Sequence, residues 1–236
     1  MSYPNMSILQ KISKIFAAKN DRLSVPWPEY NNNATADWVR KQSGLPWLRL
    51  DIEIPVATIH EEILAIKQYL RAHRTDYNEH ADWSSFCIHG KAFDATREDE
   101  YYNDTRPYIW TNEALKYMPK TVEFFRDVWP NDGYYRLRVM ELAPGGVISV
   151  HRDTALPGVL QPVNIAITQP TQCDFYMENF GIVPFEVGSS FLLNIGNRHT
   201  VINNSKEYRY HIIIHHLSLK ELDSLVLKSY NKSYAS

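Results

Sequence analysis

Two histidines and an aspartate are the residues of this chain whose types and spacing best suit a metal site. His151 and Asp153 are two positions apart, and His199 follows 48 positions after His151 (199 − 151 = 48). On a strand, residues i and i+2 point to the same face, so His151 and Asp153 can bind one ion while Arg152 points away. Two imidazoles and one carboxylate suit Fe(II), with coordination positions left open for a co-substrate and O2. We therefore predict an iron site and oxygenase chemistry.

An arginine completes this pattern. Arg209 lies ten positions after His199 (209 − 199 = 10), in an alternating run that continues to His211. A guanidinium group makes two parallel charge-assisted hydrogen bonds to a carboxylate. We expect Arg209 to bind the distal carboxylate of a dicarboxylate such as 2-oxoglutarate, whose 2-oxo acid end would chelate the iron. His211 could face the same interior and either support a ligand or contact the substrate.

Composition limits the classes of function that are possible. The 236 residues carry 25 Lys and Arg against 27 Asp and Glu, which argues against binding to a nucleic-acid backbone. Only two cysteines are present, far apart, so neither a disulfide framework nor a cysteine zinc site is expected. The chain lacks a secretory signal pattern and a membrane-length apolar run, so we expect a cytoplasmic protein without a membrane span. The oligomeric state is not determined by these features.

Periodicity divides the chain into a helix-rich first part and a β-rich second part. Apolar spacing predicts helices over residues 7–18, 59–70 and 111–127, the last interrupted near Pro119, and alternation predicts a strand over 48–54. After Gly133 the period becomes two. The predicted strands cover residues 134–142, 147–152, 163–168, 173–177, 190–195, 200–203 and 208–215. A capping box, Ser218-x-x-Glu221, predicts a closing helix.

Several short strands at close spacing favour a sandwich or jelly roll over a parallel sheet. We expect a mainly β core, a cupin-like double-stranded β-helix, with flanking helices that come mostly from the N-terminal half. The whole chain is predicted to be one catalytic domain. It would consist of a helix-rich part (1–132), the β-helix core (133–217) and a C-terminal helix and tail (218–236).

The β-rich half resembles the aspartyl/asparaginyl β-hydroxylase family of Fe(II)- and 2-oxoglutarate-dependent oxygenases. The order and spacing of several pieces carry the resemblance, and a weaker similarity covers residues 83–90. The main pieces are residues 142–153 (LAPGGVISVHRD), Cys173, residues 185–191 (FEVGSSF), residues 199–205 (HTVINNS) and Arg209.

The resemblance implies a double-stranded β-helix with iron on His151, Asp153 and His199, and with 2-oxoglutarate on Arg209. Many members carry an arginine and a histidine, as R-x-H, on the strand after the first ligand. This chain has Pro162-Val163-Asn164 there, so a second basic contact is missing and Asn164 is left as a neutral donor. The implied reaction is hydroxylation of an amino-acid side chain, in a peptide or a free amino acid, or of another small metabolite.

Other residues receive weaker expectations. The similarity around residues 83–90 places Trp83 beside the substrate, and Arg97, Arg106 and Arg198 could bind a substrate carboxylate. His60, His73 and His80 are expected to be solvated, and Cys173 to be a small buried apolar residue. Loops between Asn78 and Trp110 are expected to set specificity.

Two other functions remain open at this level. A cupin-like protein could hold a metal and an organic acid without turnover, and Pro162 in place of the expected arginine is the feature in its favour. A zinc hydrolase could use the same ligands, although the HExxH helix of many such enzymes is absent.

Overall fold

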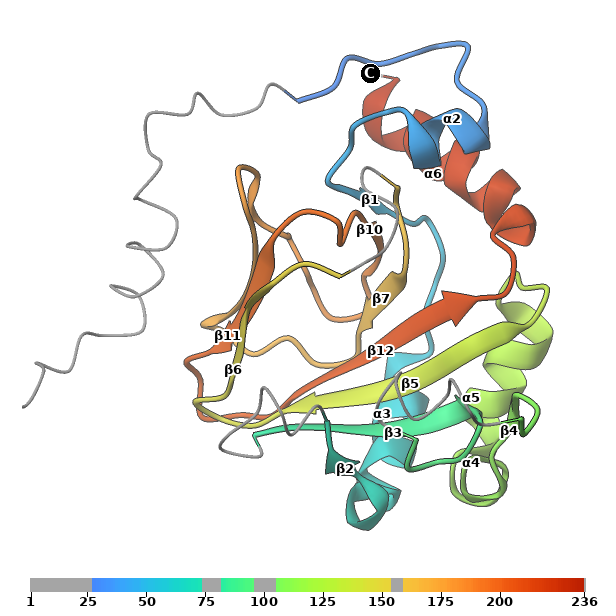
Figure 1. Ribbon diagram of the computed structural model, residues 1–236, viewed down its shortest axis with the longest axis vertical. Coiled ribbons are helices and arrows are strands. Elements are labelled where there is room, and N and C mark those ends of the chain that lie inside the picture. The colour runs from blue at the N-terminus through green and yellow to red at the C-terminus, as the bar shows by residue number, and fades with distance from the viewer. Residues whose placement is uncertain (1–26, 74–81, 96–104, 154–158, 236) are drawn as a thin grey trace, which may run out of the picture.

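The strands of the protein form two antiparallel sheets that face each other as a jelly roll (Figure 1). The computed structural model describes residues 27–73, 82–95, 105–153 and 159–235. The large sheet has the order β1-β10-β7-β12-β5-β3-β2, with β4 paired to β3, and the small sheet has the order β6-β11-β8-β9. This arrangement confirms the predicted double-stranded β-helix. The predicted limits of a single catalytic domain stay a prediction.

The described elements have the following bounds. The helices and helical turns are α2 (Ala36–Lys41), α3 (Val56–Ala65), η1 (Lys67–Tyr69), α4 (Asn112–Tyr117), α5 (Pro119–Glu123), η3 (Phe124–Val128), η4 (Lys220–Leu222) and α6 (Asp223–Tyr234). The strands are β1 (Trp47–Arg49), β2 (Arg71–Ala72), β3 (Trp83–Gly90), β4 (Ile109–Trp110), β5 (Tyr134–Leu142), β6 (Val147–His151), β7 (Val163–Ala166), β8 (Cys173–Met177), β9 (Gly181–Ile182), β10 (Ser190–Leu193), β11 (His199–Asn203) and β12 (Arg209–His216).

The large sheet has one apolar face and one face that is partly polar. Ile212 and Ile214 of β12 belong to the core that also contains Ile59 of α3 and Val226 of α6, so the helices cover the outer face of the sheet. The alternate residues of β12 point to the inner face, toward the small sheet. A second core, which includes Phe175 of β8, fills the space near the small sheet. The polar side chains of β12 therefore lie between the two sheets, beside this second core.

A tight turn delivers β6 to the site. Gly145 has a φ of 76°, which side-chain-bearing residues rarely adopt. A Cβ on Gly146 would lie 2.9 Å from the carbonyl oxygen of Ala143, so only glycine fits without a shift. The side-chain amide of Asn203 on β11 donates to the carbonyl oxygens of Leu142 and Ala143, at 3.2 and 3.0 Å. These contacts fix the start of β6 against β11.

The observed elements correct several predictions. β5 and β8 have the predicted bounds, and the break at Pro119 is confirmed because α5 begins there. Residues 83–90, which were expected to be irregular, form strand β3, because they pair with β5 along most of its length. The strand predicted over 48–54 ends at Arg49. Beyond that point the backbone bonds to other partners, since the Asp51 N–H donates to the Ser229 hydroxyl at 2.9 Å.

The helix predictions are also displaced. The helix predicted over 59–70 begins at Val56, ends at Ala65 and is followed by the turn η1. The expected capping box does not cap α6, which starts at Asp223; the Ser218 hydroxyl instead accepts from the N–H of Lys220. The helix predicted over 7–18 lies outside the described residues. No helix in the described ranges is long and apolar enough to cross a membrane.

Candidate active site

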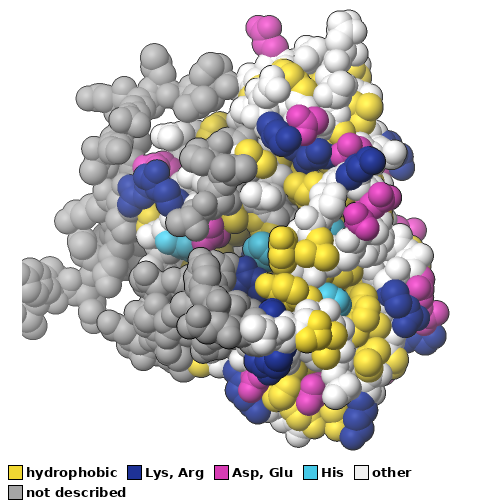
Figure 2. All heavy atoms as spheres, turned by 45° about the vertical axis from the view of Figure 1, so that its right-hand side comes forward, with side chains coloured by type: hydrophobic (Ala, Val, Ile, Leu, Met, Phe, Trp, Pro, Cys, Tyr) yellow, Lys and Arg dark blue, Asp and Glu magenta, His cyan; other side chains and the backbone are white. Residues whose placement is uncertain are grey.

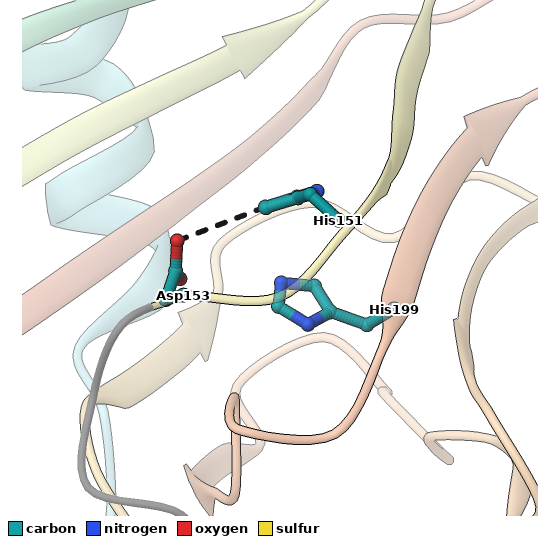
Figure 3. A group of neighbouring side chains, drawn as sticks. All are labelled: His151, Asp153 and His199. Atoms are coloured by element: carbon teal, nitrogen blue, oxygen red, sulfur yellow. Dashed lines mark ion pairs between the residues drawn. The ribbon is translucent and has the colours of Figure 1, made fainter.

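The three predicted metal ligands come together at one end of the small sheet (Figure 3). His151 is the last residue of β6, His199 is the first residue of β11, and the two are directly opposite in the register of the strands. Asp153 follows β6, and its backbone N–H donates to the carbonyl oxygen of Ile195 at 3.1 Å. The ligand atoms of the three side chains all lie within 4.8 Å of one another. A single metal ion can therefore contact all three.

Backbone carbonyl groups orient both imidazoles. His151 Nδ1 lies 2.7 Å from the carbonyl oxygen of Ser149, and His199 Nδ1 lies 2.9 Å from that of Asn197. Because a carbonyl oxygen can only accept, each Nδ1 must carry its hydrogen, which leaves the Nε2 lone pair for a metal. The ring of Phe175 stacks on His199 at 5.3 Å with an interplanar angle of 11°. Both histidines are thus held in the ligand tautomer before any metal binds.

Burial keeps His199 neutral. Its side chain is almost wholly enclosed, and this burial, together with the nearby His151, lowers the pKa of His199 to about 4. His151 and Asp153 are more open, with 36% and 45% of their side chains exposed, and the His151 Nε2 lies 3.9 Å from a carboxylate oxygen of Asp153. His199 therefore lies on the buried side of the ligand group, and His151 and Asp153 lie on the side that is open to solvent.

Arg209 lies in the interior on the facing sheet. It is the first residue of β12, and only 4% of its surface is exposed. Burial lowers the pKa of Arg209 to about 10, which still leaves the guanidinium charged at neutral pH. Within the described residues, no carboxylate lies within 4.0 Å of it. A buried cation without an acidic partner is costly, so this position favours an anionic ligand.

A short polar network holds the Arg209 side chain. An Arg209 Nη2 lies 2.9 Å from Nδ1 of His211, and His211 Nε2 lies 3.1 Å from Oε1 of Gln169. Gln169 donates its own amide hydrogen to the carbonyl of Cys173, so its oxygen is the atom that faces His211. His211 therefore carries its hydrogen on Nε2 and accepts from Arg209 through Nδ1. Burial and the charge of Arg209 hold the pKa of His211 well below its usual value, in agreement with a neutral ring.

The neighbouring strand β7 completes this end of the site. Asn164 is buried, and its Oδ1 lies 2.6 Å from Nδ1 of His211. Because Nδ1 is an acceptor in this tautomer, the amide bonds to it when turned by 180°, so that its nitrogen donates. Pro162, which stands where many members of the resembling family have a basic residue, lies in the wall of the same cavity. Arg209 is therefore in contact with a neutral histidine, which Gln169 and Asn164 hold in turn, where many members have a second basic residue.

A single cavity of about 760 Å³ joins the metal-ligand group to Arg209. His151, Asp153, His199, Asn164 and Arg209 all line it. Figure 2 shows histidine and basic side chains beside a hollow near the middle of the face drawn there. The cavity is large enough to hold an organic acid together with part of a second molecule.

The structure also locates Trp83, His73 and Cys173, for which the expectations from the sequence were weaker. Trp83 lines the cavity and packs edge-on against His73, with ring centroids 4.3 Å apart. His73 was expected to be solvated, but it is buried and its Nδ1 lies 2.9 Å from the Ser85 hydroxyl, because the unpredicted strand β3 covers it. Cys173 is buried, and burial raises the pKa of its thiol to about 11.

The arginines singled out from the sequence are not the ones in the cavity wall. Arg106 is exposed and Arg198 pairs with Glu178 at 3.6 Å, and neither lines the cavity. Arg97 and His80 lie outside the described residues, and His60 packs beside Tyr210 on the outer face of the sheet. Arg136 and Arg138 of β5 line the cavity instead. Their two-residue spacing within a predicted strand was the signal that could have found them.

A comparison with protein families gives one match for the chain. The family model for aspartyl/asparaginyl beta-hydroxylase matches residues 54–218. Among curated proteins, none matches the chain.

Solved structures give weaker likenesses. A prolyl hydroxylase from Trichoplax adhaerens, in complex with a peptide fragment of the hypoxia inducible factor oxygen degradation domain, is 15% identical. The match covers 92% of this chain and 96% of that chain, with a TM-score of 0.47. An oxidoreductase of the 2OG-Fe(II) oxygenase family from Burkholderia pseudomallei is 14% identical, with coverage of 81% and 94% and a TM-score of 0.46. The family match is the stronger of these findings.

Proposed function

Because the chain belongs to the aspartyl/asparaginyl β-hydroxylase family and is an Fe(II)- and 2-oxoglutarate-dependent oxygenase, we propose that it hydroxylates an amino-acid side chain. The substrate would be a peptide residue or a free amino acid. We also propose a cytoplasmic location, since a chain with two distant cysteines has no disulfide framework to maintain.

We assign Fe(II) to His151, Asp153 and His199. Their chemistry fits the metal, since two neutral imidazoles and one carboxylate suit non-haem iron and leave positions open. Both histidines present Nε2, because each Nδ1 donates to a backbone carbonyl. The convergence of the ligand atoms within 4.8 Å supports the same assignment.

We assign the distal carboxylate of 2-oxoglutarate to Arg209, and this residue carries the proposal. Arg209 is buried and charged, and it has no acidic partner among the described residues. It shares one cavity with the metal-ligand group. A dicarboxylate offsets the cost of the buried charge, and it is the kind of molecule that can reach from this arginine to a metal. His211, which is in contact with Asn164 and Gln169, keeps the guanidinium in place where many members use a second basic residue.

When bound, Fe(II), 2-oxoglutarate and O2 supply the oxidation of an unactivated carbon–hydrogen bond to an alcohol, with release of succinate and carbon dioxide. The contribution of the chain is to orient and enclose these groups. The backbone carbonyl oxygens of Ser149 and Asn197 fix the tautomers of His151 and His199. His211 orients the guanidinium of Arg209 through a contact with its Nη2. The exposed sides of His151 and Asp153 leave an approach for the substrate.

The test is a coupled product analysis. The iron-loaded protein is incubated with 2-oxoglutarate and a set of free amino acids and short peptides, and succinate and hydroxylated product are measured together. We expect equal amounts of both in the presence of a substrate, and no product without O2. Product that forms equally well under strict anaerobiosis, or turnover that does not need 2-oxoglutarate, would contradict the proposal and return the zinc hydrolase to consideration.

A further inference from the structure

Strand β5 has a β-bulge beside the cavity. In its register with β12, Arg136 is directly opposite His215. The next pair along the two strands is Tyr134 with His216. One step along β12 therefore matches two residues of β5, and Tyr135 is the extra residue. β-Bulges often lie next to active sites, where they redirect a side chain. Because Tyr135 lines the cavity, this bulge lies in the wall of the active site.

The ring of Tyr135 is held by the protein and is still open to a ligand. Tyr135 is 47% exposed, and its ring contacts Tyr108 edge-on, with ring centroids 5.5 Å apart and an interplanar angle of 79°. The Nζ of Lys91 lies 4.6 Å from the ring centroid of Tyr108 and supports that ring in turn. A tyrosine supplies a large flat contact at a low cost in conformational entropy. This position therefore suits a planar group of the substrate.

His215 adds a hydrogen-bonding group to the same part of the wall. It alternates with Ile213 on β12, and both residues line the cavity. Burial, together with the charges of Arg136 and Arg138, holds the pKa of His215 well below its usual value, so its ring is neutral. A neutral imidazole has one N–H donor and one acceptor. The Nδ1 of His215 is buried and has no hydrogen-bond partner among the described residues. An unpaired buried atom costs free energy, which a ligand with a matching polar atom recovers.

The length of the large sheet separates this region from Arg209. His215 lies six residues beyond Arg209 on β12 (215 − 209 = 6), which corresponds to about 20 Å along a strand. A molecule of 2-oxoglutarate on Arg209 and the metal covers only part of that length. Since one extended residue spans about 3.3 Å, the stretch is longer than a five-carbon co-substrate and a free amino acid occupy together. A chain of more than one residue is needed to reach from the metal to His215.

Apolar side chains lie beside the bulge. Leu219 follows β12, lines the cavity and packs partly against the core of the large sheet. Leu217 is 48% exposed, and its backbone N–H donates to the carbonyl oxygen of Gly133 at 3.0 Å, two residues before Tyr135. Hydrophobic side chains also gather beside histidine on the face drawn in Figure 2. An exposed apolar surface that continues a cavity is typical of a binding site for a larger ligand.

We infer that Tyr135 and His215 bind a peptide bond of the substrate, next to the residue that is hydroxylated. The flat face of a peptide bond lies against the tyrosine ring, and its N–H and C=O match the acceptor and the donor of the imidazole. The side chain of the neighbouring substrate residue lies against Leu217 and Leu219. The substrate class is then a peptide and not a free amino acid. This inference rests on the proposed function, since it places the hydroxylated residue at the metal.

The test is a binding measurement with the co-substrate position already filled. The protein is loaded with Mn(II) and N-oxalylglycine, an inert relative of 2-oxoglutarate. Each of the twenty common amino acids is then titrated by calorimetry in two forms. One form is the free amino acid, and the other is its N-acetyl N-methylamide, which has a peptide bond on either side. We expect at least one capped form to bind about tenfold or more tightly than the free form of the same residue.

Variants locate the effect. Tyr135→Ala should weaken binding of that capped form about tenfold, whereas Tyr135→Phe should keep it, because the ring remains. His215→Phe should weaken it about threefold to tenfold, and His215→Asn less, because a carboxamide keeps a donor and an acceptor. Tyr208→Ala is the matched control, since Tyr208 is 42% exposed but stacks on Tyr210, away from the cavity lining. N-oxalylglycine binding reports that each variant is folded and that the co-substrate position is intact.

Four results would overturn the inference. They are that no capped form binds, that free amino acids bind as tightly as their capped forms, that neither Tyr135→Ala nor His215→Phe weakens binding, or that Tyr208→Ala weakens it as much as Tyr135→Ala. Failure of N-oxalylglycine to bind the wild-type protein would instead contradict the assignment of Arg209, and with it the proposed function.

Discussion

The two ends of the cavity are built in opposite ways. The metal-ligand end comes from the small sheet, and His151 and Asp153 there keep 36% and 45% of their side chains exposed. The Arg209 end comes from the large sheet, and Arg209 and His211 are buried in a polar network. The open end admits the groups that change during a reaction. The closed end binds the distal carboxylate of 2-oxoglutarate, which does not react. Burying the charge of Arg209 there costs free energy, and the bound carboxylate offsets that cost.

The largest effect is expected at the open end. Replacing His199 by Ala removes a ligand that no neighbouring group can supply, so 2-oxoglutarate turnover should fall to the background of metal-free protein. The measurement is succinate formation together with bound iron after desalting. His60→Ala, on the outer face of the sheet, is the control and should keep both. Retention of iron and turnover in His199→Ala would place the metal elsewhere.

The next effect is expected at the closed end. Arg209→Ala should raise the KM for 2-oxoglutarate by about a hundredfold or more, because a buried carboxylate would lose its charged partner. Arg209→Lys should recover part of this loss, since it restores the charge without the paired hydrogen bonds. Steady-state succinate formation measures both. A KM that is unchanged in Arg209→Ala would show that the two ends are not joined by 2-oxoglutarate.

A smaller effect is expected when the orientation of Arg209 is changed and its charge is kept. His211→Phe keeps a ring but removes the acceptor for Arg209, so we expect the affinity for 2-oxoglutarate to fall about tenfold. Iron binding should not change, because His211 lies on the other sheet. The readout is 2-oxoglutarate titration beside iron content. Equal losses of iron and of 2-oxoglutarate affinity would indicate a general structural role instead.

The smallest effect lies outside both ends. Burial lowers the pKa of His89 on β3 to about 4, whereas an unfolded histidine titrates near 6.5. Between these values the unfolded state binds more protons, so the free energy of unfolding should decrease as the pH falls from about 6.5 to about 4. Urea unfolding at several pH values measures this slope. His89→Phe should flatten it, and an unchanged slope in this variant would assign the acid sensitivity to other groups.

The sequence predicts the open end better than the closed end. His151 and Asp153 are identifiable because a strand places i and i+2 on one face, and that rule needs no tertiary information. His199 and Arg209 follow from their spacing in the family resemblance. Asn164 was predicted to contact the co-substrate, and His211 to support a ligand or contact the substrate. The contact between these two residues depends on how β7 pairs with β12, which periodicity does not specify.

The misplaced predictions have a common cause. His73 and β3 were misjudged because burial at β3 comes from pairing with β5, a contact between segments about fifty residues apart. Arg136 and Arg138 alternate with apolar residues in a strand that was predicted correctly, yet the polarity of its inner face is decided by the cavity. Local patterns predict elements, whereas the lining of a cavity depends on which faces meet.

The most direct test of the account is the visible charge-transfer band of a 2-oxoglutarate chelate on Fe(II), recorded without oxygen. We predict that the band forms in the wild-type protein. It should need far more 2-oxoglutarate in Arg209→Ala and should be absent in His199→Ala. If the wild-type protein binds iron but gives no band, the three ligands and Arg209 do not hold one co-substrate between them, and the central claim is wrong.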